Sequence, residues 1–149
     1  MTRVTVRASI DAPVEVVFAA VTDIENLPAT NPDIAKIEFL GERRSGVGTR
    51  FRETRMMKGK PAVTDLEVTE FVENERARMV TDSHGTVWDT LFTVRATGGE
   101  TELTIAMDAR PHKLLPRVMV PIFKGMFRKG MVGHVEQVKA YCEEKAREA

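Results

Sequence analysis

Cysteine, tryptophan and tyrosine are scarce in this sequence of 149 residues, which contains one of each. The single cysteine, Cys142, excludes an internal disulfide framework and suits a reducing cytoplasm. Cys142 also lies at helical spacing from Val138, which indicates a packing role rather than a catalytic thiol. The fold must therefore be held together by its hydrophobic core.

Long apolar runs are also missing. No segment reaches the roughly 18 apolar residues that cross a bilayer, and the first residues alternate between polar and apolar without the apolar core of a signal peptide. Basic and acidic side chains both number 22, so no net positive charge favours nucleic acid. These absences predict a cytoplasmic protein, and a chain of this length without a repeat or linker predicts one domain over residues 1–149.

Motifs for phosphate binding and nucleophilic catalysis (GxGxxG, Walker-type and GxSxG) do not occur, which argues against nucleotide use and the commonest hydrolase scaffold. The three histidines, His84, His112 and His134, do not stand at metal-ligand spacing, and no CxxC pair occurs. We expect neither a metal site nor a cofactor.

The apolar periodicity of the sequence predicts a series of strands interrupted by two short helices near the N-terminus. A first strand has its apolar side chains on one face, at Val4, Val6, Ala8 and Ile10. Pro13 suits the first turn of a helix, and two short helices are predicted over residues 13–22 and 24–30. After Pro32 the period-two pattern returns and gives six further strands.

Two hairpins test this prediction, because each turn fixes the register of its strands. Centring the first turn on Lys58-Gly59 pairs Phe51 with Leu66, Glu53 with Thr64 and Arg52 with Asp65. Centring the second on Gly98-Gly99 pairs Val94 with Leu103, Phe92 with Ile105, Thr90 with Met107 and Trp88 with Ala109. Both registers place the apolar side chains on one face.

From about residue 114 to residue 147 the apolar period becomes helical. One stripe contains Leu115, Met119, Ile122 and Met126, and a second stripe contains Phe127, Met131, Val135, Val138 and Cys142. Pro121, Gly125, Gly130 and Gly133 lie where the stripe changes face, which predicts one long, bent helix. The predicted fold class is α+β, with a curved seven-stranded antiparallel sheet around this helix.

This order of elements resembles the START/Bet v 1-like (SRPBCC) superfamily, specifically its polyketide cyclase/dehydrase-like branch. The matching segments are residues 10–18 (IDAPVEVVF), Asn31-Pro32, residues 46–51 (GVGTRF) and residues 66–71 (LEVTEF). The resemblance covers essentially the whole chain and implies the helix-grip fold. It also implies a cavity for lipids, sterols, polyketides or other apolar molecules, which some members bind and others convert as cyclases or hydrolases.

The inward positions are interpreted as the ligand-binding lining of such a cavity. The sheet contributes Phe51, Leu66, Met79, Trp88, Thr90, Phe92, Ile105 and Met107, and the helix contributes Met119, Ile122 and Met126. A filled core would give the same pattern, but the methionines favour an adaptable lining.

Glu53, Arg55 and His134 are the candidates for catalysis. The register that buries Phe51 points Glu53 and Arg55 inward, where a carboxylate can act as acid or base and an arginine can hold an anionic group. The alternative is that both extend past the core into water. His134 joins them if it faces the cavity, and Thr90 would add a hydroxyl.

The leading hypothesis is binding or transport of a hydrophobic small molecule such as a lipid or polyketide. The alternative is a cyclase, dehydratase or hydrolase acting on an aromatic or polyketide substrate, and the sequence leaves open whether the protein is an enzyme. A third reading, a protein-interaction module, requires an exposed apolar patch, and the sequence shows no clear one.

Charge is uneven in one stretch, residues 109–135, which holds basic but no acidic residues. The basic residues are Arg110, Lys113, Arg117, Lys124, Arg128 and Lys129. They form either a solvated helix face or a surface for transient contact with an anionic membrane.

Overall fold

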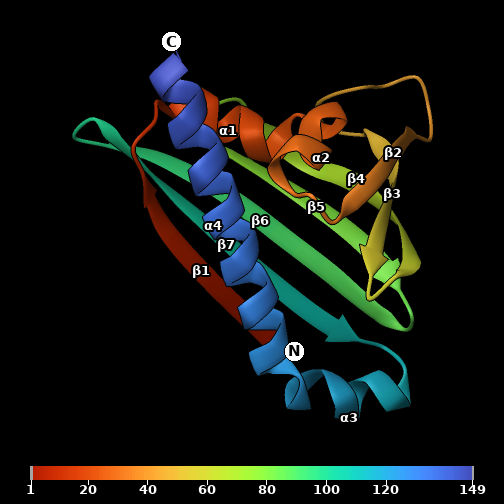
Figure 1. The fold of residues 1–149 in the computed structure, drawn as a ribbon. Helices are drawn as coiled ribbons and strands as arrows, with labels where there is room; N and C mark the ends of the chain where they lie inside the picture. The colour runs from red at the N-terminus through yellow and green to blue at the C-terminus, as the bar shows by residue number, and fades with distance from the viewer. Residues whose placement is uncertain (1, 149) are drawn as a thin grey trace.

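The computed structural model describes residues 2–148, so that Met1 and Ala149 of the predicted domain lie outside it. Its strands form one open antiparallel sheet in the order β1-β7-β6-β5-β4-β3-β2 (Figure 1). The strands are β1 (Thr2–Ile10), β2 (Ile34–Phe39), β3 (Arg50–Met57), β4 (Lys60–Val72), β5 (Arg76–Ser83), β6 (Thr86–Thr97) and β7 (Glu100–Pro111). The predicted seven-stranded antiparallel sheet is confirmed.

Both predicted hairpin registers are confirmed. The β3–β4 hairpin pairs Glu53 with Thr64, and β6–β7 has all the predicted pairs. Gly98 and Gly99 have φ angles of 57° and 95°, the positive values that a two-residue type I′ turn requires. Because side chains alternate along a strand, these registers fix which residues face the interior.

Three short helical segments follow β1 and close one end of the sheet, which we call the closed end (Figure 1). They are α1 (Val14–Thr22), the 3-10 turn η1 (Ile24–Asn26) and α2 (Leu27–Thr30). Pro13 stands directly before α1, where its missing N–H costs no hydrogen bond. The two predicted helices are therefore present, the second as a 3-10 turn continuing into a short α-helix.

The C-terminal segment is two helices, α3 (Leu114–Ile122) and α4 (Lys124–Glu148), rather than the single bent helix predicted. Pro121 lies in the last turn of α3, which it weakens close to the break, because its ring has no N–H and clashes with the carbonyl four residues earlier. Phe123, between the helices, leaves the helical region with ψ 13°. α4 crosses the concave face of the sheet, while α3 projects beyond the other end, the open end (Figure 1).

The core fills the space between the sheet and the C-terminal half of α4. Val138 and Cys142 of α4 are fully buried with Ile10 and Leu103 of the sheet. Burial raises the pKa of the Cys142 thiol to about 11, so this cysteine is protonated and packed, in agreement with its predicted role. Truncating a buried leucine such as Leu103 to alanine costs about 2–5 kcal/mol of folding free energy.

Charged side chains cover the convex face of the sheet. Asp89 and Asp108 lie directly opposite each other on β6 and β7, an arrangement that is unfavourable unless cations neutralise it. Arg78 and Arg110 bind Asp89 at 2.8 and 3.1 Å, and Arg3 binds Asp108 at 2.7 Å. This face is therefore stabilised by ion pairs and needs no covering layer.

Candidate functional site

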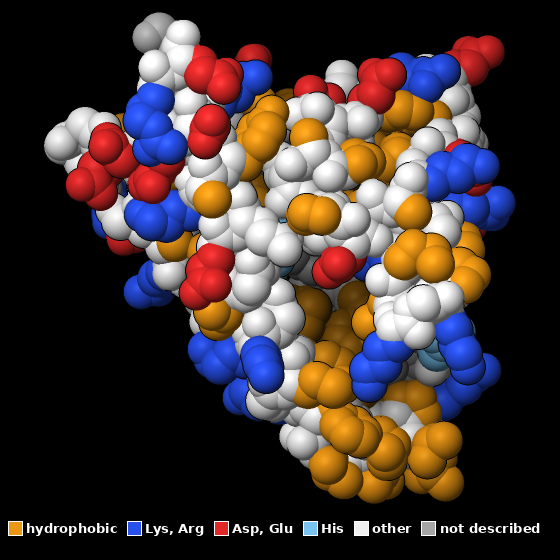
Figure 2. Space-filling view, viewed as in Figure 1, with side chains coloured by type: hydrophobic (Ala, Val, Ile, Leu, Met, Phe, Trp, Pro, Cys, Tyr) orange, Lys and Arg blue, Asp and Glu red, His pale blue; other side chains and the backbone are white. Residues whose placement is uncertain are grey.

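A cavity opens between the sheet and the N-terminal half of α4, toward the open end. Four side chains of the concave face are only partly buried there, namely those of Leu66, Trp88, Thr90 and Met107. A close-packed interior would bury apolar groups of this size completely. The space-filling view shows a hollow beside α4 with hydrophobic side chains inside it (Figure 2). The molecule thus has a packed half and an open half.

The other predicted sheet residues form the floor beneath this cavity. Phe51, Met79, Phe92 and Ile105 are buried and belong to the hydrophobic core. The sheet residues of the predicted lining thus all lie on the concave face, some filling the core and some facing the opening.

The predicted helix residues of the lining lie elsewhere. The expectation that Met119, Ile122 and Met126 face the sheet is wrong, because their exposed fractions are 36%, 66% and 59%. The chain changes direction at Phe123, so that the apolar stripe of α3 points away from the sheet. The cavity is therefore not covered by α3.

Phe127 and Met131 occupy the helix side of the cavity in their place. Both are partly buried, and the Phe127 ring packs edge-on against Trp88 with centroids 5.1 Å apart. Such aromatic pairs add about 0.5–1.5 kcal/mol beyond burial of area. The second apolar stripe of the sequence contains both residues, but the predicted lining does not include them.

Glu53 and Arg55 form an ion pair on the concave face. Arg55 Nε and Nη2 lie 3.2 and 3.1 Å from Oε1 of Glu53. Glu53 has only 8% of its surface exposed, whereas the Arg55 side chain keeps 36%. The alternative that both side chains extend into water is excluded for Glu53. A buried carboxylate needs such a partner, because desolvation of an unpaired charge is costly.

His134, a residue of α4, is the third member of this cluster. Burial, and secondarily the positive charge of Arg55, lower the pKa of His134 from its usual 6.5 to about 4. The ring is therefore neutral at pH 7 and carries one N–H donor and one acceptor nitrogen. The positive charge of Arg55 acts on His134, so His134 borders the space that the β3 pair faces.

The cluster offers complementary chemistry in an apolar surrounding. Both close contacts from Arg55 end on Oε1 of Glu53, which leaves Oε2 for a ligand. The neutral imidazole of His134 can donate to a carbonyl or accept from a hydroxyl. Charge-assisted hydrogen bonds at a desolvated site are strong and orient a ligand.

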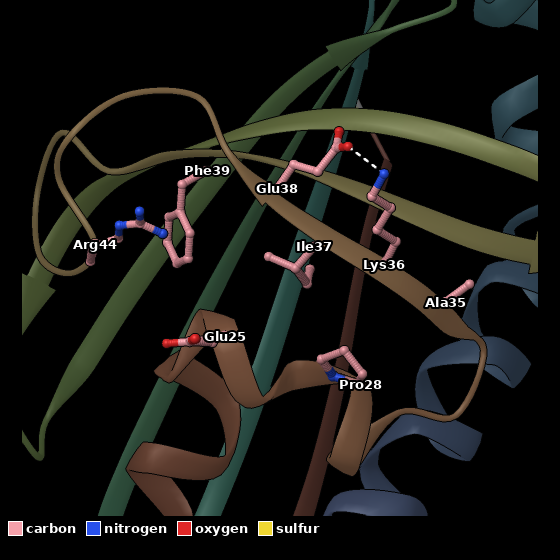
Figure 3. A pocket seen from close by; sticks show the side chains of 8 residues that line it. All are labelled: Glu25, Pro28, Ala35, Lys36, Ile37, Glu38, Phe39 and Arg44. Atoms are coloured by element: carbon pink, nitrogen blue, oxygen red, sulfur yellow. Dashed lines mark ion pairs between the residues drawn. The ribbon is translucent and has the colours of Figure 1, made fainter.

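Two open clefts lie outside this cavity. One, of about 450 Å³, lies between the η1–α2 segment and the edge strand β2. Figure 3 shows Lys36 paired with Glu38 there, at 2.6 Å, and Arg44 beside the Phe39 ring. The second, of about 520 Å³, separates α2 from the C-terminal half of α4. At the first cleft Lys36 and Glu38 pair with each other and Arg44 lies over the Phe39 ring, so we assign the candidate site to the cavity with Glu53.

The remaining histidines lie apart from the cluster. His84 and His112 are exposed, and His112 pairs with Asp82 at 2.8 Å. Within residues 2–148 no group of His, Cys, Asp and Glu side chains is arranged to hold a metal ion. Over the same range, no helix combines the length and apolar character of a membrane span.

A curved antiparallel sheet that grips a C-terminal helix around an open cavity defines the Bet v 1-like helix-grip class. Within this class, residues 1–143 match the family described as "polyketide cyclase / dehydrase and lipid transport". The chain belongs to this family, and the resemblance noted in the sequence is confirmed. A comparison with curated proteins found no match.

Solved structures share the fold at low sequence identity. A START superfamily protein from Mycobacterium smegmatis is 19% identical with a TM-score of 0.72, over 98% of this chain and 97% of that one. Norcoclaurine synthase from Thalictrum flavum is 13% identical with a TM-score of 0.72, over 93% and 91%. The di-domain ARO/CYC StfQ from the steffimycin biosynthetic pathway is 11% identical with a TM-score of 0.79, over 97% of this chain and 51% of that one.

Proposed function

We propose that the protein binds a hydrophobic small molecule, such as a lipid or polyketide, between the sheet and the N-terminal half of α4. The observation that carries this proposal is the partly exposed apolar wall of Leu66, Trp88, Met107, Phe127 and Met131. Apolar groups facing an open space gain free energy, about 25 cal/mol per Å², when a ligand removes them from water. The lipid transport named in the family description supports the same reading.

The ligand is expected to carry at least one polar group. Glu53, Arg55 and His134 lie on the β3 and α4 sides of the cavity, where an apolar ligand alone would leave them desolvated without new partners. A hydroxyl or carbonyl group placed there binds Oε2 of Glu53, the neutral His134 ring, or Arg55. A polar end and an apolar body therefore fit this cavity better than a pure hydrocarbon.

Filling the cavity tests the proposal. Thr90 is partly exposed on the concave face between Met79 and Met107, so Thr90→Phe should occupy the space that a ligand needs. Thr93→Phe is the matched control, because Thr93 lies on the same strand and the opposite face. We expect ligands from a lipid and polyketide panel to raise the melting temperature of the wild type and of Thr93→Phe, and native mass spectrometry to show them bound. Thr90→Phe should show neither effect, and equal ligand binding by all three proteins would disprove the proposal.

A second candidate function is acid–base catalysis on an aromatic or polyketide substrate. The neutral His134 ring and the buried Glu53 carboxylate favour it, since a base and a donor on facing walls can move a proton and polarise a carbonyl. Glu53→Gln separates the functions. Turnover should fall by about 10²-fold or more if Glu53 transfers a proton, whereas a protein that only binds should keep most of its affinity.

A further inference from the structure

The short helix α3 presents an apolar face to solvent. Exposed fractions run from 36% for Met119 to 79% for Leu114 among its outward apolar side chains, and Phe123 and Met126 extend the surface into α4 at 39% and 59%. We call this surface the α3 patch; its residues are Leu114, Leu115, Val118, Met119, Ile122, Phe123 and Met126. The expectation from the sequence that no clear apolar patch is exposed is therefore wrong. Patches of this kind on a protein surface mark interaction sites.

α3 turns its broad apolar face to solvent, whereas an ordinary surface helix buries that face. At about 100° per residue, the five exposed apolar side chains between Leu114 and Ile122 fall within an arc of about 140°. Val120 lies on the opposite side, is 5% exposed, and is the buried residue of this helix, which contacts β7. The helix is therefore anchored by its narrow side, and its broad apolar face is turned outward.

Positive charge surrounds this face. Lys113, Arg117, Lys124 and Lys129 are exposed, and residues 109–135 contain no acidic side chain. None of these four takes part in the ion pairs found among residues 2–148. Their charge is thus available to an external anionic partner.

We infer that the α3 patch docks on the surface of an anionic lipid bilayer. An interfacial helix inserts its apolar face at the boundary of the acyl chains while lysine and arginine contact the anionic headgroups. A second copy of the chain is a poorer occupant, because a two-fold contact through this patch brings two basic rims together. The charge complementarity therefore selects the membrane.

Docking would also place the cavity next to the bilayer. The space-filling view shows the hydrophobic side chains over α3 as one surface with those of the hollow (Figure 2). A ligand leaving the bilayer at the α3 patch reaches the cavity along this apolar surface. This role in loading rests on the proposed function, whereas docking itself does not.

Co-sedimentation with vesicles tests the docking. We expect the protein to bind vesicles of phosphatidylcholine with phosphatidylglycerol at 7:3, and to bind pure phosphatidylcholine at least about tenfold more weakly. Leu115→Asp/Ile122→Asp should abolish binding. Lys124→Glu/Lys129→Glu should weaken binding to the anionic vesicles at least about tenfold, and added salt should weaken it as well.

Matched controls lie away from α3. Val47→Asp changes an apolar residue that is 52% exposed in the β2–β3 loop, and Lys145→Glu/Arg147→Glu changes the same net charge at the far end of α4 (Figure 1). Both should bind as the wild type does. Equal binding to the two vesicle types, or a wild-type dimer that Leu115→Asp/Ile122→Asp dissociates, would overturn the inference. Ligand binding measured without vesicles tests the proposed function separately, because the α3 variants leave the cavity intact.

Discussion

Acid should weaken this protein through His134 in a defined pH window. Its pKa is about 4 in the folded state, against 6.5 ordinarily. Between these values the unfolded chain binds a proton that the folded chain does not, so the free energy of unfolding decreases as pH falls. The two pKa values differ by about 2.5, which corresponds to about 3 kcal/mol of folding free energy. This stability is lost between pH 6.5 and pH 4, and none of it is lost above pH 6.5. This is a large fraction of the roughly 5–15 kcal/mol that stabilises a typical domain.

The assay is urea denaturation of wild type and His134→Gln at several pH values between 7 and 4. Carboxylates that titrate in this range affect both proteins, so the difference between the two curves isolates His134. His134→Gln should gain stability relative to the wild type as pH falls, by up to about 3 kcal/mol. Met131→Leu, a change in the same wall without an ionisable group, should keep the wild-type slope. Parallel curves for wild type and His134→Gln would refute a partly buried, neutral His134, as would an NMR titration of His134 centred near 6.5.

Two further predictions concern α4 and the convex face. A Cβ at Gly130 or Gly133 would meet no atom within 4 Å, so each Gly→Ala change should raise the free energy of unfolding by about 0.5–1 kcal/mol. Thermal or urea unfolding measures this change. A loss of stability would contradict a continuous α4. The Arg3 guanidinium bonds to Asp108 and lowers the pKa of that carboxyl below its ordinary 3.8, so Arg3→Met should be less stable than the wild type at pH 7. This deficit should shrink as pH falls through the lowered pKa and Asp108 protonates, and a deficit that does not change with pH would contradict the ion pair.

The strands and their facing could be predicted because they depend on local rules. Gly98-Gly99 fixes the turn that sets the β6–β7 register, and alternation along β3 places Glu53 and Arg55 on the same face as Phe51. This alternation correctly predicts that Glu53 and Arg55 lie on the concave face. Alternation could not show that Glu53 is buried, because burial depends on how elements distant in the chain pack together.

The C-terminal segment shows where local rules are insufficient. Pro121 and the shift between stripes indicated a bend, but both a bend and a break satisfy the same spacing. The sequence predicts that Met119, Ile122 and Met126 face the interior, since most amphipathic helices bury their apolar face. The burial of Val120 and the exposure of Leu115 and Ile122 in the structure show that α3 turns its apolar face outward. Likewise, the lowered pKa of His134 depends on its burial and on Arg55, which is 79 residues distant in the chain.

Trp88 offers the most direct measurement of the proposed cavity, because it is the only tryptophan and packs against Phe127 beside the opening. Titration with parinaric acid, an apolar chain with a polar end that absorbs at the emission of tryptophan, should quench Trp88 saturably at about one ligand per chain. Thr93→Phe and Leu115→Asp/Ile122→Asp should preserve this quenching, and Thr90→Phe should abolish it. Quenching that does not saturate, or that Thr90→Phe leaves unchanged, would contradict a ligand site between the sheet and α4.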